Sequence, residues 1–76
     1  MFARNRAPEI SQKVLRRVSR CRTDELTLWA EQTTVAVHHS YRSWQTQSDH
    51  YMLEEARLGA EALHAILEEL SLRYSK

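Results

Sequence analysis

Cationic side chains recur along one side of a predicted helix near the start of the chain. Their spacing is i, i+3, i+4 and i+7, and they are Lys13, Arg16, Arg17 and Arg20. Residues three and four apart lie on one helix face, so the four charges form one stripe. The other side of the same segment is apolar and carries Ile10, Val14, Val18 and Cys21. Such a basic amphipathic helix can bind the carboxylates of an acidic protein surface or the phosphates of a nucleic acid.

The charge of the whole chain is divided unevenly. Residues 1–22 hold seven basic residues and one acidic residue, whereas residues 23–76 hold four basic and nine acidic residues. The asymmetry points to an oppositely charged partner, or to pairing of the basic stripe with the chain's own glutamates at 54, 55, 61, 68 and 69. The total charge is only +1, and nucleic-acid-binding domains are usually basic as a whole. We therefore expect a protein partner for the basic stripe, with nucleic acid as the alternative.

Other residue groupings that could carry chemistry have simpler explanations. Glu61, His64 and Glu68 share a helix face, but the Glu-x-x-His spacing occurs once and faces outward, which favours a surface ion-pair cluster over a metal site. Cys21 continues the apolar side of its helix, which favours packing over a reactive thiol. An enzyme would need a pocket built from Arg16, Arg17, Arg42 and Glu31. We predict no catalytic residue, no bound metal and no cofactor, and hence a protein that is not an enzyme.

Length and composition limit the fold to one small helical domain, residues 1–76. Glycine, proline and cysteine each occur once among 76 residues, so strand-connecting turns are scarce and no intrachain disulfide can form. A domain of this size is marginally stable alone and is often stabilised by association. No apolar run approaches the ~20 residues of a membrane span, and the first residues do not resemble a secretory signal. We expect a cytoplasmic protein.

Hydrophobic periodicity predicts three helices after a flexible arm at residues 1–7. The first spans about residues 8–21 and begins at Pro8. The second spans about residues 24–45 and is capped by Thr23; the third spans about residues 49–74 and is capped by Ser48 or Asp49. The apolar seam of the second helix is Leu26, Ala30, Thr33, Val37, Ser40 and Trp44. The seam of the third is Leu53, Ala56, Ala60, Leu63, Leu67, Leu70 and Tyr74.

Two alternatives to this helical hairpin remain open. The β-branched stretch at residues 33–37 could form a strand, although no second strand is available to pair with it. A single helix of some fifty residues is also possible, because no Gly or Pro separates the second helix from the third. The seam changes phase between Trp44 and Leu53, however, which favours a turn. Gly59 in mid-helix predicts a close helix contact at that point.

A second apolar stripe lies outside the predicted hairpin seam and predicts an interface. Its residues are Leu28, Val35, Tyr51, Leu58, Ala65 and Leu72. The first helix could fold back over this stripe to give a three-helix bundle, or a second copy could cover it. We expect an all-α, three-helix protomer that assembles into a dimeric helical bundle. The predicted function is that of an interaction module, an adaptor or regulatory subunit, that self-associates and docks a protein partner.

Overall fold

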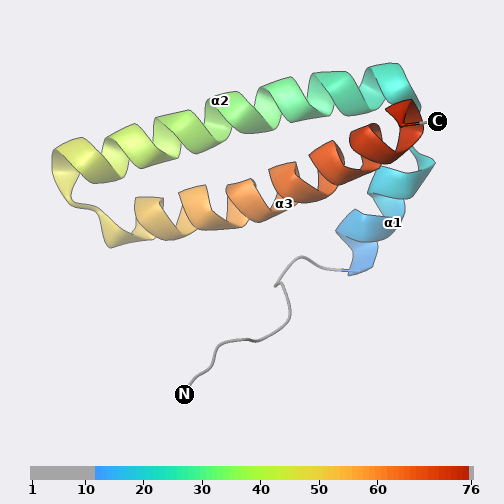
Figure 1. The fold of residues 1–76 in the computed structure, drawn as a ribbon. Helices are drawn as coiled ribbons and strands as arrows, with labels where there is room; N and C mark the ends of the chain where they lie inside the picture. Colours follow the sequence, from blue (N-terminus) through green and yellow to red (C-terminus); the bar gives the residue numbers. More distant parts are fainter. Residues whose placement is uncertain (1–11, 76) are drawn as a thin grey trace.

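The protein consists of one short and two long α-helices (Figure 1). The structure is a computed structural model that describes residues 12–75. Helix α1 spans Gln12–Arg20, α2 spans Thr23–Gln47 and α3 spans His50–Tyr74. The all-helical expectation is confirmed over this range, since the β-branched stretch at 33–37 is helical and no strand occurs in it. The expected arm at residues 1–7 and the expected helix start at Pro8 lie outside the described residues.

Helices α2 and α3 form an antiparallel hairpin closed by a two-residue turn. Ser48 adopts a left-handed backbone conformation, with φ 55° and ψ 36°, and its N–H donates to the Trp44 carbonyl oxygen at 2.7 Å. Asp49 caps α3, because its side chain accepts a hydrogen bond from the Tyr51 N–H at 3.0 Å. The chain therefore reverses direction without glycine, and the expectation of two helices in place of one long helix is confirmed.

Helix α2 begins differently from the expectation. Thr23 is its first residue, and the N-cap position belongs to Arg22, whose backbone N–H donates to the Glu25 carboxylate at 3.1 Å. The Thr23 hydroxyl is instead used in a tertiary contact, where it accepts a hydrogen bond from Arg73 at 3.2 Å. The predicted Thr23 cap is therefore wrong, because an arginine distant in sequence binds the hydroxyl and a glutamate side chain satisfies the free backbone donor.

The seam of α2 agrees with its prediction, whereas α3 is rotated relative to its prediction. Leu26 is fully buried, and the other five predicted seam residues of α2 are half-buried. On α3, four of the predicted seam residues are exposed, and they are Leu53, Ala60, Leu67 and Tyr74. The inward side of α3 carries instead Met52, Ala56, Gly59, Leu63, Ile66 and Leu70. On this side α3 packs against α1 as well as α2, and Ile66 lies in one cluster with Val18.

The two long helices approach each other closely at Gly59. A Cβ atom built on Gly59 would lie 2.8 Å from Cγ2 of Val37, which is closer than two carbon atoms pack. Glycine therefore allows α2 and α3 to approach each other at this level. The contact that the mid-helix glycine predicted is confirmed, and it sets Val37 level with Gly59.

The best-packed region lies at the end of the hairpin where the three helices meet. Val18 of α1, Leu26 of α2 and Ile66 of α3 are buried there in one cluster. Partly buried residues surround it, namely Val14, Cys21, Trp29, Ala30, Ala65 and Leu70. Toward the turn only Ala56 is buried among the described residues. The position of α1 therefore depends on this single cluster and on the polar contacts around it.

Candidate functional site

The four cations of the predicted basic stripe surround one open depression beside α1. The depression has a volume of about 380 Å³. It is lined by Lys13, Arg16, Arg17, Arg20, Cys21 and Glu25. The helical spacing thus brings the four charges to one place, as expected for residues on one face, and residues 21–25 supply the far wall.

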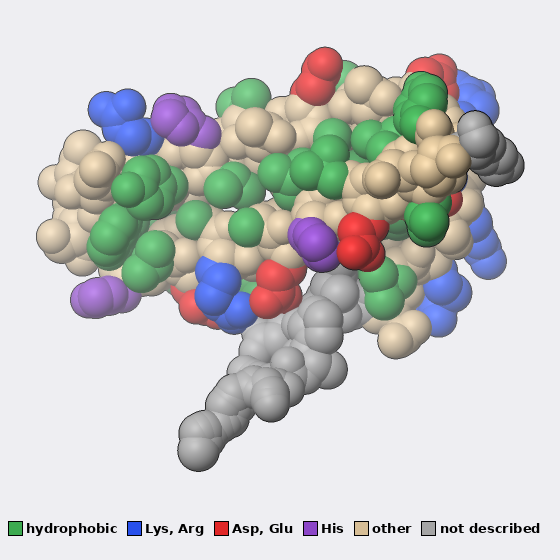
Figure 2. Space-filling model, in the orientation of Figure 1, with side chains coloured by type: hydrophobic (Ala, Val, Ile, Leu, Met, Phe, Trp, Pro, Cys, Tyr) green, Lys and Arg blue, Asp and Glu red, His purple; other side chains and the backbone are tan. Residues whose placement is uncertain are grey.

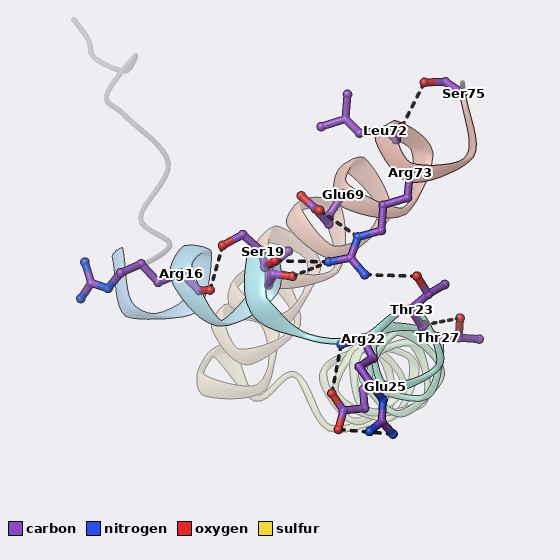
Figure 3. A network of polar contacts seen from close by, with 11 residues as sticks. Arg16, Ser19, Arg22, Thr23, Glu25, Thr27, Glu69, Leu72, Arg73 and Ser75 are labelled. Atoms are coloured by element: carbon purple, nitrogen blue, oxygen red, sulfur yellow. Dashed lines mark hydrogen bonds and ion pairs between the residues drawn. The ribbon is translucent and has the colours of Figure 1, made fainter.

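An arginine from the opposite end of the chain holds α1 in place (Figure 3). The Arg73 guanidinium donates to the carbonyl oxygens of Val18 and Ser19 at 3.4 and 3.3 Å and to the Thr23 hydroxyl. Its Nε donates to the Glu69 carboxylate at 2.9 Å. Carbonyls at a helix C-terminus have no partner within the helix and attract a positive charge. Arg73 therefore joins the last turn of α1 to the first turn of α2.

A second depression continues the first along α2 and shares Arg17, Cys21 and Glu25 with it. Its volume is about 340 Å³, and it is lined by Arg17, Cys21, Glu25, Leu28, Trp29 and Gln32. The Arg17 guanidinium lies 4.3 Å from the centre of the Trp29 ring, within the range of a cation–π contact. Leu28 is 55% exposed. We call the two depressions together the basic groove: cations line one part of it and apolar side chains line the other.

Among residues 12–75 the acidic side chains that form ion pairs do so with cations other than those of the groove, and Glu25, which lines both depressions, pairs with Arg22. None of Lys13, Arg16, Arg17 and Arg20 forms an ion pair with another described residue. The glutamates at 54, 61, 68 and 69 pair within α3, with Arg57, His64 and Arg73. Internal pairing between the basic stripe and α3, one of the alternatives from the sequence, is therefore not found between residues 12 and 75.

Two exposed carboxyl groups, Asp24 on α2 and Glu54 on α3, have a pKa lowered by a neighbouring arginine. The Arg22 guanidinium donates to Asp24 at 3.2 Å and lowers the pKa of that carboxyl. The same contact raises the pKa of Arg22. On α3, hydrogen bonds from Arg57 lower the pKa of Glu54. These pairs are exposed and contribute little to stability.

The predicted interface stripe is distributed over several surfaces. Ala65 packs against the buried cluster, Leu28 lines the basic groove, and Val35 lines a groove between α2 and α3. The exposed members on α3 are Tyr51, Leu58 and Leu72. The structure does not bring these six residues together, because α1 covers part of the stripe and the rotation of α3 turns other apolar residues outward.

The remaining candidate groups lie apart from the basic groove. His64 pairs with Glu68 at 3.3 Å, and Glu61 pairs with Arg57. Cys21 is a free, half-buried thiol beside the buried cluster. No group of three or more His, Cys, Asp and Glu residues among the described residues could hold a metal ion. Within the same range, no helix is long and apolar enough to cross a membrane.

One residue of the site was not found from the sequence. Arg73 was not singled out, although it falls seven residues after Ile66 and fourteen after Gly59, on the stripe that turns inward. The residue set considered for an enzyme is separated: Arg16 and Arg17 line the basic groove, whereas Glu31 lines the groove between α2 and α3.

Comparison of the chain with protein-family models, curated proteins and solved structures gave no match.

Proposed function

We propose that this protein is a non-enzymatic helical interaction module, an adaptor or regulatory subunit, that binds an acidic segment of a protein partner in the basic groove. The observation that carries the proposal is the set of four cations without a described acidic partner, lying beside Leu28 and Trp29. Self-association of the module is part of the same proposal and uses a different surface.

The chemistry of the groove defines the segment that would fit it. Carboxylates on one side of a short helix or extended segment would pair with Lys13, Arg16 and Arg20. An apolar side chain of the same segment would contact Leu28 and the exposed part of Trp29. Exposed ion pairs contribute only about 0.2–1 kcal/mol each, so the apolar contact adds affinity and the charges add specificity and speed of association.

The experiment uses the groove's own tryptophan as the reporter. A Trp44→Phe variant leaves Trp29 as the single tryptophan, so its emission reports on the groove. The probe is a helical peptide with four glutamates along one face and a leucine within that face. A peptide with glutamines in place of the glutamates is the control. We expect the acidic peptide to shift the Trp29 emission and the glutamine peptide to bind much more weakly.

A matched pair of charge reversals separates the groove from general electrostatics. Arg16→Glu changes a groove residue, whereas Arg42→Glu changes an arginine on α2 that lines neither depression. Both arginines are exposed, and both change the net charge equally. We expect Arg16→Glu to weaken peptide binding about tenfold, equivalent to ~1.4 kcal/mol, and Arg42→Glu to change it less than twofold. Equal losses in the two variants would contradict the proposal.

Nucleic acid is the competing partner in the same assay. Four cations on a helix could also contact phosphates, and such binding falls steeply with salt. If a duplex DNA or RNA probe binds more tightly than the acidic peptide at the same salt concentration, and Arg16→Glu abolishes that binding, the protein-partner proposal is replaced by the nucleic-acid alternative.

A further inference from the structure

The face of the hairpin opposite the basic groove is apolar and open. A groove of about 570 Å³ runs between α2 and α3 there, lined by Thr27, Ala30, Glu31, Thr34, Val35, Leu67 and Leu70. No residue of α1 lines it. Figure 2 shows hydrophobic side chains gathered in a band along the junction of the two long helices, with charged side chains and histidines along both edges. We call this surface the open face.

The apolar content of the open face results from the rotation of α3. Leu53, Ala60 and Leu67 recur every seven residues and are exposed, with Leu67 at 51%. Together with the groove, they place apolar side chains along much of the hairpin. A contiguous apolar band of this length on a small protein marks an interaction surface. Only four of the described residues, 12–75, are buried, which gives a second reason to cover it.

We propose that a second copy of this chain covers the open face, giving an antiparallel four-helix bundle in which α2 packs on α2 and α3 on α3. The twofold axis lies perpendicular to the helices, midway between residues 34 and 35 of α2 and between residues 62 and 63 of α3. This proposal deepens the self-association part of the proposed function and is independent of the basic groove.

The charges along the edge of α3 are self-complementary about one point. The edge carries Arg57, Glu61, His64 and Glu68, spaced four, three and four residues apart on one stripe. When α3 is placed antiparallel to its own copy, Arg57 meets Glu68 and Glu61 meets His64. Both pairs have the same midpoint, between residues 62 and 63. The ion pairs within each α3, Arg57 with Glu61 and His64 with Glu68, would then extend across the interface.

The edge of α2 gives an independent midpoint at the same level. Glu31 lines the open groove, and His38 follows seven residues later on the same stripe. In the antiparallel arrangement Glu31 meets His38 of the other copy, with a midpoint between residues 34 and 35. A histidine N–H can donate to a carboxylate whether or not the ring is charged. This edge therefore also joins groups that attract each other.

The two midpoints lie at nearly the same level along the hairpin, as a single twofold axis requires. Val37 is level with Gly59, because of the close contact between them. The α2 midpoint lies two and a half residues before Val37, so it is level with a point between residues 61 and 62 of the antiparallel α3. The α3 midpoint is one residue further on, a difference of about 1.5 Å along the helix. The alternative dimer, with both turns at the same end, would not create these pairs.

The size of the open face suits a stable dimer. Helices of 25 residues are about 37 Å long, and two of them side by side are about 20 Å wide. Covering that face would bury on the order of 700 Å² per copy, close to the ~800 Å² per partner of a standard stable interface.

Two matched cysteine variants test the axis directly. Thr34 and Thr27 are both exposed on the open face, and each hydroxyl donates to the carbonyl four residues earlier, at 2.8 and 3.0 Å. In a Cys21→Ala background, Thr34→Cys places one cysteine beside its copy at the axis. Thr27→Cys places the two thiols about 22 Å apart along the helices, beyond the reach of a disulfide. Mild oxidation should therefore cross-link the Thr34→Cys chains and leave the Thr27→Cys chains single.

A charge exchange gives a second, independent readout. We expect light scattering to show twice the 9.0 kDa chain mass at tens of micromolar. Glu31→Lys should weaken the dimer about fivefold, and the added change His38→Glu should restore it, because the pair is then reversed.

A monomer overturns this inference and the self-association proposal, but leaves the basic groove proposal standing. A dimer in which Thr27→Cys cross-links as readily as Thr34→Cys, or in which His38→Glu gives no rescue, overturns the axis alone.

Discussion

Replacing Gly59 with alanine tests the close approach of the two long helices. The added methyl would lie 2.8 Å from Cγ2 of Val37, where about 3.5–4.0 Å is the favourable separation. Valine in a helix has one strongly preferred rotamer, so its methyl group cannot easily rotate away. The helices must then separate by several tenths of an ångström, and such overpacking costs about 1–3 kcal/mol.

Alanine also gains helix propensity, which opposes the clash. The gain relative to glycine is about 1 kcal/mol, so Gly59→Ala should destabilise the protein by about 1 kcal/mol in net terms. In a Val37→Ala background the clash is absent and only the gain in propensity remains. There the same substitution should stabilise by up to ~1 kcal/mol, so the coupling between the two sites is about 2 kcal/mol.

The assay is urea unfolding followed by circular dichroism for all four members of this double-mutant cycle. Protein concentration is held constant, because association would make the apparent stability depend on it. A change of 1 kcal/mol corresponds to about 4–8 °C in Tm for a domain of this size, which is readily measured. If Gly59→Ala stabilises the wild type as much as it stabilises Val37→Ala, the side chain of Val37 does not restrict the space at residue 59, and the two helices are not in close contact at this level.

Three further predictions concern the ends and edges of the helices. Arg73→Met should lower stability by about 2 kcal/mol and accelerate amide exchange in α1 more than in α3, because the carbonyls of α1 lose a charged donor; equal exchange in both helices would contradict this. Ser48→Gly should raise the free energy of unfolding by about 0.5–1 kcal/mol in urea titrations, since glycine adopts the left-handed conformation without strain; a loss of stability would refute it. Arg57 lowers the pKa of Glu54 below its ordinary 4.5, so this pair contributes stability above that pH and loses it as the pH falls through the folded pKa; the stability difference between wild type and Arg57→Gln should therefore shrink on acidification, and a constant difference would contradict it.

Local pattern predicted the elements of the fold well. The expected bounds of the two long helices, 24–45 and 49–74, agree with the structure to within two residues at each end. The change of seam phase placed a turn between Trp44 and Leu53, and the structure has it at Ser48 and Asp49, where neither glycine nor proline marks it. The seam of α2 was also correct, because this helix has one dominant neighbour and its inward residues follow a simple heptad.

Contacts that involve α1 as well as the hairpin could not be predicted from the periodicity of a single helix. The seam of α3 differs from its prediction, because the inward side of α3 faces α1 as well as α2 and the periodicity of α3 alone does not include α1. Ile66 became a core residue and Leu67 an exposed one for this reason. Arg73 binds residues about fifty positions away in the sequence. A local sequence pattern cannot predict a contact over such a separation.

The candidate site residues came from two kinds of pattern, one within a single helix and one that combined two helices. The four cations share a face of α1, and the structure gathers them around one depression. The predicted interface stripe combined residues of α2 and α3 on the assumption of a particular rotation, and the structure separates Leu28, Val35 and Ala65. The rotation of one packed helix relative to another is set by tertiary contacts, so the hydrophobic periodicity of each helix alone does not predict it.

The most direct test of the basic groove is to map the binding of the acidic peptide on the backbone amides. Labelled protein is titrated with the glutamate peptide, and the chemical-shift changes are followed residue by residue by nuclear magnetic resonance. We predict that the largest changes fall within residues 13–32, around Arg16 and Trp29, and are absent in Arg16→Glu. Changes centred on the open face near Thr34 and Leu67, or no changes at low salt, would contradict the proposed function.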